Sequence, residues 1–107
     1  MSVNNSARAE TATELYATMD GTTKLIGSLA FNPVQIIFDN QGTVAIQIYR
    51  NQTTNVWHTF PAGEALILDM RAAHGLAHNF TFSVGDTFYG NGASGPFSIS
   101  YTYAKEL

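Results

Sequence analysis

Hydrophobic and polar side chains alternate along most of this chain, which is the period-two pattern of half-buried β-strands. The clearest run is 97–103, where Phe, Ile and Tyr occupy the odd positions and Ser and Thr the even ones. The same pattern predicts strands at 25–31, 34–39, 43–50, 56–60, 64–69, 80–84 and 87–89. The chain after residue 21 therefore reads as about eight short strands.

Turn-forming residues separate these runs at short intervals, as in sandwiches and barrels. Asn40-Gln41-Gly42 lies between the runs 34–39 and 43–50 and predicts a hairpin that joins them. The glycine-rich segment 90–95 predicts a tight or flexible loop before the last strand. The expected fold is all-β: a jelly-roll-like antiparallel β-sandwich that occupies residues 22–107.

The first 21 residues differ in texture, because they are rich in Ala, Thr and Glu. Leu15 or Tyr16 and then Met19 continue a thin apolar stripe at helical spacing. An isolated helix of this length is marginal in water. We therefore expect an amino-terminal arm or short helix over residues 1–21 that becomes ordered on a partner, with Leu15, Tyr16 and Met19 as candidate interface residues.

The composition adds a surface property to this picture. The chain has 107 residues, the size of one domain, and only 12% of them are charged, against about 25% in ordinary proteins. Ser, Thr, Asn and Gln must therefore cover most of the surface. Such a surface is cheap to desolvate, which favours burial against neighbouring copies of the chain; a weakly charged secreted or tail domain is the alternative.

Charge and residue usage also exclude several classes of function. The net charge is −3 without a basic run, so we expect no nucleic-acid partner. The absence of Cys removes disulfides, thiolate metal sites and a cysteine nucleophile. No apolar stretch reaches the roughly 18–20 residues of a membrane span, and 1–5 lacks a signal-peptide pattern, so we expect no membrane partner.

Three histidines and one tryptophan are the candidate ligand or interface residues. His74 and His78 have the spacing of a helical metal pair, but Gly75 between them disfavours a helix. We therefore interpret these two and His58 as loop or interface residues and expect no metal. Trp57, beside a polar turn, is the best candidate for an exposed platform that stacks on a sugar ring.

Catalytic patterns are weak throughout the chain. Glu64 and Asp69 are five residues apart in a predicted strand, so their side chains point to opposite faces and cannot flank one glycosidic bond. No Ser lies in a G-x-S-x-G turn. We expect neither an enzyme nor a cofactor.

Three segments resemble small virion proteins of tailed bacteriophages. They are Phe31-Asn-Pro-Val-Gln-Ile-Ile-Phe-Asp-Asn-Gln, Pro61-Ala-Gly-Glu-Ala-Leu-Ile-Leu-Asp-Met-Arg-Ala-Ala-His-Gly and Gly95-Pro-Phe-Ser-Ile-Ser-Tyr-Thr-Tyr-Ala. In that group, N-P-x-x-I-x-F-x-N opens the sandwich, A-G-x-x-x-x-L-D lies mid-chain and G-x-F-x-x-x-Y-x-Y closes it. The resemblance implies a structural protein located in the virion, without catalytic residues.

Two functional hypotheses follow. The first is a homo-oligomeric bacteriophage virion protein, either a capsid decoration (cement) protein or a head–tail or tail component, with copies of itself and major capsid, connector or tail proteins as partners. The second is a carbohydrate-binding β-sandwich, in which Trp57 and the 90–95 loop would line a sugar site.

Overall fold

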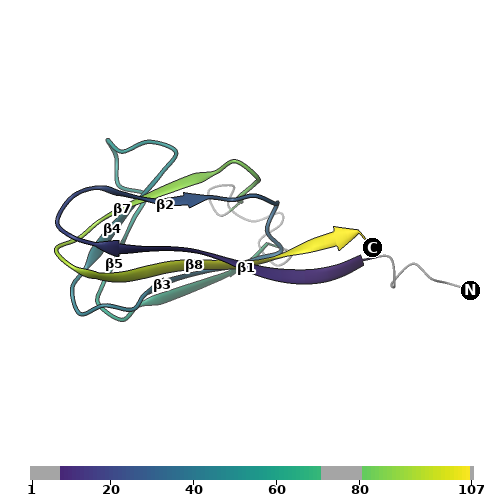
Figure 1. Cartoon of the computed structure of the whole chain (residues 1–107), viewed down its shortest axis with the longest axis horizontal. Helices are drawn as coiled ribbons and strands as arrows, with labels where there is room; N and C mark the ends of the chain where they lie inside the picture. Colours follow the sequence, from purple (N-terminus) through teal and green to yellow (C-terminus); the bar gives the residue numbers. More distant parts are fainter. Residues whose placement is uncertain (1–7, 71–80, 107) are drawn as a thin grey trace, which may run out of the picture.

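The structure, a computed structural model, describes residues 8–70 and 81–106 and contains only β-strands in that part of the chain (Figure 1). The expected all-β sandwich is confirmed: two antiparallel four-stranded sheets pack together, with strand orders β1-β8-β3-β6 and β2-β7-β4-β5. The strands are β1 (Arg8–Met19), β2 (Lys24–Ser28), β3 (Gln35–Asn40), β4 (Ile46–Arg50), β5 (His58–Phe60), β6 (Ala65–Asp69), β7 (Thr87–Asn91) and β8 (Gly95–Glu106).

The pairing is nested, as in a long hairpin rolled into two layers. β1 pairs with β8, β2 with β7, β3 with β6 and β4 with β5, and each pair is antiparallel. Every connection crosses from one sheet to the other except the one between β4 and β5. This is the arrangement of an eight-stranded jelly roll.

The core lies between the two sheets and is built from one face of each strand. In β3 the alternation is complete, since Ile36, Phe38 and Asn40 are buried while their neighbours are not. The ring of Phe38 lies at the centre of an aromatic cluster, within 5.1–5.9 Å of four other ring centroids. Those rings belong to Trp57, Phe60, Phe82 and Phe88. Edge-to-face and tilted pairs of this kind add about 0.5–1.5 kcal/mol each to the burial of the rings.

The hairpin expected at 34–50 is wrong, because β3 and β4 belong to different sheets. The Asn40 side chain explains the change of layer. Its Nδ2 donates to the carbonyl oxygens of Val44, Phe60 and Pro61, and its Oδ1 accepts from the Gly42 N–H. These bonds fix a corner between the sheets where the sequence predicted a turn within one sheet.

The strand expected at 80–84 is also wrong over its described part, since residues 81–86 form a loop. Phe82 is buried in the aromatic cluster, while Ser83 and Val84 are exposed. The Ser83 N–H donates to the carboxylate of Asp86, which closes a local turn. Phe82 is thus buried as a single anchor of a loop, although its place in an alternating sequence predicts a strand.

The short helix considered for residues 1–21 is wrong over the described residues, because Arg8–Met19 is strand β1. It pairs with β8 in an unbroken register from Arg8↔Glu106 to Met19↔Gly95. Residues 1–7 lie outside the described part. The long β8 supplies a tertiary partner, and such a partner overrides a weak helical preference.

The molecule is elongated, with extents of 55 × 25 × 22 Å. Pairing of β3 with β8 ends at Gln35↔Thr102, whereas β1 and β8 continue to Arg8↔Glu106. The far ends of β1 and β8 therefore form a two-stranded ribbon that projects beyond the other strands (Figure 1). No helix long and apolar enough to cross a membrane occurs in the described residues.

Candidate interaction surface

The outer face of the sheet β1-β8-β3-β6 is a regular surface built from all four strands, and we call it the open face. Residues directly opposite each other in the ladders share a face. One row therefore runs from Glu14 through Ser100 and Ile37 to Ile67. The open face consists of Ala12, Glu14, Tyr16, Ser98, Ser100, Thr102, Gln35, Ile37, Asp39, Ala65, Ile67 and Asp69.

The open face is polar but carries few charges. Its central strand, β8, contributes only the small hydroxyl side chains Ser98, Ser100 and Thr102. A shallow hollow of about 140 Å³ lies over Ser100 and Thr102, between Ala12 on β1 and the longer side chains of β3. Tyr16 and Ile67 stand at opposite sides of the sheet and are 55% and 60% exposed. The face thus combines exposed hydrophobic side chains with a low central floor.

The outer face of the second sheet, called the second face here, is free of charge along its central rows. Leu25 lies opposite Tyr89, and Tyr89 lies opposite Tyr49. In the adjacent row Gln47 lies between Asn91 and Thr59. The central rows of the second face therefore lack charge, whereas the open face carries three carboxylates.

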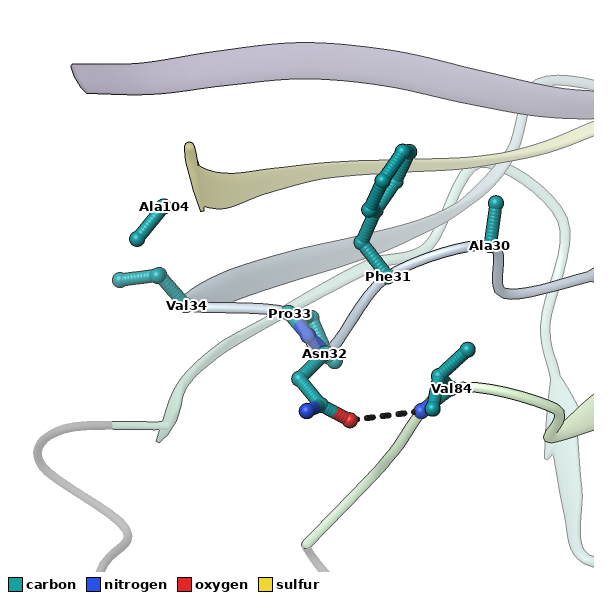
Figure 2. Close-up of a pocket in the computed structure, with 7 residues that line it drawn as sticks. All are labelled: Ala30, Phe31, Asn32, Pro33, Val34, Val84 and Ala104. Atoms are coloured by element: carbon teal, nitrogen blue, oxygen red, sulfur yellow. Dashed lines mark hydrogen bonds between the residues drawn. The ribbon is translucent and has the colours of Figure 1, made fainter. Parts of the chain in front are cut away.

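A groove of about 480 Å³ lies at the end of the sandwich, and we call it the end groove (Figure 2). The Phe31 ring stacks on the Tyr103 ring at a centroid distance of 3.8 Å. Asn32 Oδ1 accepts a hydrogen bond of 2.8 Å from the Val84 N–H, which ties the β2–β3 connection to the 81–86 loop. The lining residues are Ala30, Phe31, Asn32, Pro33, Val34, Val84 and Ala104.

Sequence reasoning did not identify the end groove as a site. The Asn32-Pro33 break did signal that a strand ends there, and Pro cannot donate to a continuing ladder. No local signal, however, predicts the stacking of Phe31 on Tyr103, because the two residues meet only through the tertiary fold.

Trp57 lies in the aromatic cluster and is half-buried. Its ring centroid is 5.1 Å from that of Phe38 and 5.6 Å from that of Phe82. Much of the indole surface is therefore occupied by core contacts. His58 is adjacent to it: its Nε2 lies 3.3 Å from Glu64 Oε1, and its ring contacts Phe60 edge-on at 4.4 Å.

The three amino-terminal candidates separate according to the strand alternation of β1. Met19 is buried, and Leu15 packs against the core. Tyr16 points the other way, onto the open face. Only Tyr16 is therefore placed for contact with another molecule. His74 and His78 lie outside the described residues.

A polar cluster links Arg50 on β4 to the 81–86 loop. Arg50 Nη2 is 2.7 Å from Asp86 Oδ2 and 2.8 Å from the Thr81 carbonyl oxygen. Its guanidinium also lies 4.4 Å from the centroid of the Phe82 ring. These contacts hold the loop over the core, which is a structural task. Among the described residues, no group of three His, Cys, Asp or Glu side chains could hold a metal.

Comparison with known proteins gives little further information. No family model matches the chain, and no curated protein matches it. One solved structure with a similar fold comes from work titled "Bacillus endospore appendages form a novel family of disulfide-linked pili". It is 15% identical, with a TM-score of 0.47, over 94% of this chain and 89% of that one. A likeness of this size carries no argument about function, and the 107 residues contain no Cys for a disulfide.

Proposed function

We propose that this chain is a structural subunit that assembles with copies of itself. The observation that supports the proposal is the chemistry of the two outer faces of the sandwich. The central rows of the second face have no charge at all. The residues assigned above to the open face include three carboxylates, those of Glu14, Asp39 and Asp69, but no Lys or Arg.

The energetics of desolvation connect this chemistry to assembly. Burying an unpaired charge costs several kcal/mol, whereas a hydroxyl or amide loses little once it finds a hydrogen-bond partner. Exposed Tyr16 and Ile67 add apolar area that gains free energy on burial. The low floor of Ser and Thr on β8 allows a second surface to approach the sheet closely. The second face and the hydroxyl floor of the open face thus favour contact with another protein over permanent exposure to water.

The setting that we propose for the assembly is the virion of a tailed bacteriophage. The support is the resemblance of three sequence segments to small phage virion proteins, and the role would be capsid decoration or a head–tail or tail component. Mass spectrometry and immunogold labelling of purified particles test this setting. We expect the protein in stoichiometric amounts at regular positions; its absence from particles would exclude the virion and leave self-assembly standing.

Charge insertion tests the role of the outer faces. We expect Ser100→Lys on the open face or Gln47→Lys on the second face to lower the mass of the assembly in solution. The first puts a long charged side chain over the low floor of β8, and the second places a cation in rows that lack charge. Thr53→Lys adds the same charge to the exposed turn at 51–55 and is the matched control. Full assembly of all three variants would refute a role for the outer faces.

Carbohydrate binding is the second hypothesis, and a glycan array tests it with the same purified protein. Trp57 is half-buried and its ring packs against Phe38 and Phe82, which supports a sugar platform there less than an exposed indole would. A monomer that is retained on a glycan array, and that loses retention in Trp57→Ala, would favour this hypothesis over assembly.

A further inference from the structure

The outer edge of β1 carries a long row of backbone groups that point away from the sheet. β1 is the end strand of the order β1-β8-β3-β6 and pairs only with β8. The N–H groups of Val34 and Gln41 donate to the carbonyls of Thr102 and Pro96, so the even-numbered residues of β8 point their backbone groups toward β3. The odd-numbered residues of β8 therefore bond to β1.

The register transfers this alternation to β1. Odd-numbered residues of β8 lie opposite odd-numbered residues of β1, as in Leu15↔Ile99. The odd residues of β1 thus bond to β8, and the even ones direct both N–H and C=O outward. The outward residues are Glu10, Ala12, Glu14, Tyr16 and Thr18. Within the described part of the chain, no backbone hydrogen bond to these groups is formed outside the ladder.

This edge lacks several of the features by which sheet proteins normally block pairing with other chains. Those features are Pro, charged side chains and above all Lys, bulges and very short edge strands. The charged residues of β1 are Arg8, Glu10 and Glu14. β1 has 12 residues without Pro, Gly or Lys, and its ladder with β8 has no bulge. The other edges are shorter: β6 and β2 have five residues each and β5 has three. The β1 edge is therefore the one best suited to accept a further strand.

We propose that the β1 edge pairs antiparallel with the β1 edge of a second copy about a twofold axis, which joins two four-stranded sheets into one continuous sheet. This inference rests on the proposed self-assembly and identifies the surface through which two copies first associate. The length of β1 favours the β1 of a second copy as its partner, because pairing with the five-residue β6 of another copy would leave more than half of the β1 edge open. A twofold contact also closes on itself, leaving the outer faces available for further growth.

The sparse charges in the middle of β1 are compatible with the same occupant. Between Thr11 and Met19, Glu14 is the only charged residue of β1. With Leu15 on the axis, Glu14 lies opposite Tyr16 of the second copy, and within Thr11–Met19 no two carboxylates face each other directly. The outward residues Ala12 to Thr18 then exchange about eight backbone hydrogen bonds with the second copy.

Amide hydrogen exchange of the full chain, followed by NMR at several concentrations, tests the pairing residue by residue. We expect the odd amides from Thr11 to Met19 to be protected at every concentration, because they bond to β8. The even amides at Ala12, Glu14, Tyr16 and Thr18 should become protected only as the dimer forms. An oligomer whose even amides exchange as fast as in the monomer would overturn the β1 pairing but not self-assembly; a monomer throughout would overturn both.

Two matched proline substitutions test which edge is used. Ala12→Pro removes an outward N–H from β1, and Ala65→Pro removes one from β6 at the opposite edge of the same sheet. The Ala65 N–H points outward because the Asn40 N–H donates to the Glu64 carbonyl in the neighbouring ladder position. We expect Ala12→Pro to halve the mass of the dimer and Ala65→Pro to leave it unchanged.

The other outcomes of this comparison refute the twofold pairing. Loss of the dimer in both variants would indicate head-to-tail pairing of β1 with β6, and loss in Ala65→Pro alone would place the contact on β6. Ala12→Lys serves as a second variant that keeps the N–H but puts a blocking cation on the edge. Protection of the odd amides in each variant shows that β1 is still folded against β8.

Discussion

Replacing Asn40 by Ala should remove the side chain that holds the corner between β3 and β4. Asn40 is fully buried, and its Nδ2 lies 2.9–3.0 Å from three carbonyl oxygens. The NH₂ group has two hydrogens, so these contacts amount to about two donated bonds, and the Gly42 N–H adds a third bond of 3.0 Å to Oδ1.

The expected loss follows from these bonds. The three bonds are worth about 3 kcal/mol at about 1 kcal/mol each, and about 4.5 kcal/mol at the upper value of about 1.5 kcal/mol each. Asn40→Ala should therefore lower the free energy of unfolding by roughly 3–5 kcal/mol, a large part of the 5–15 kcal/mol typical of a domain. Asn55→Ala is the control, because Asn55 is exposed and its own side chain makes no hydrogen bond among the described residues; it should change the free energy of unfolding by less than about 0.5 kcal/mol.

Urea unfolding followed by the fluorescence of Trp57 measures the change in the free energy of unfolding for both variants, because this single tryptophan reports on the aromatic cluster. Asn40→Asp adds a pH test. Three carbonyl oxygens disfavour a carboxylate, so burial raises the pKa of the introduced group in the folded state. The destabilisation caused by the ionised Asp is then present above the pKa of the unfolded chain, about 3.9, and disappears below it. A loss under about 1 kcal/mol for Asn40→Ala, or a pH-independent deficit for Asn40→Asp, would refute this role of the amide.

Three further predictions concern other parts of the fold. Hydrogen bonds from Thr22, and then Lys24, lower the pKa of Asp20 to about 2, so Thr22→Val should return this pKa toward 3.8 in an NMR titration of the carboxyl carbon. Because the folded pKa is depressed, the stabilisation from Asp20 is present above the unfolded pKa and is lost as the pH falls toward 2. Gly92→Ala would place a Cβ 2.9 Å from a side-chain atom of β4, so we expect about 1–3 kcal/mol of destabilisation in urea, and wild-type stability would contradict the close approach. Asp86→Asn breaks the half-buried pair with Arg50 and should cost about 1.5–3 kcal/mol and speed amide exchange in the preceding loop; unchanged exchange would show that Asp86 does not hold it.

The strands themselves were largely predictable, but their partners were not. Period-two alternation reports which side of a strand is buried and says nothing about the sheet to which it belongs. The turn at Asn40-Gln41-Gly42 therefore predicted a hairpin, although the buried Asn40 side chain makes it a corner. Jelly-roll connections cross between sheets, and that choice is made by tertiary hydrogen bonds.

The amino-terminal strand shows a second limit of the pattern. Leu15 and Met19 are four residues apart, a spacing that places two side chains on one face in a helix and also in a strand. The short stripe could not distinguish the two periods. The deciding feature is the long β8, whose edge pairs with β1 along its whole length.

The candidate surface was foreseeable only in part. Alternation on the last strand correctly assigns Ser98, Ser100 and Thr102 to the side away from the core. The flanking strands follow from the fold, so the open face as a whole could not be derived. Phe31 and Tyr103 form the end groove through contacts between distant segments, and Trp57 packs inward beside residues that no local pattern places near it.

The central claim is that this jelly roll associates with copies of itself. Light scattering coupled to size-exclusion chromatography, repeated over a dilution series of the full chain, measures the mass directly. The expected result is a mass of at least twice the 11.6 kDa of one chain at high concentration, which decreases on dilution. A mass of 11.6 kDa at every concentration would contradict the claim.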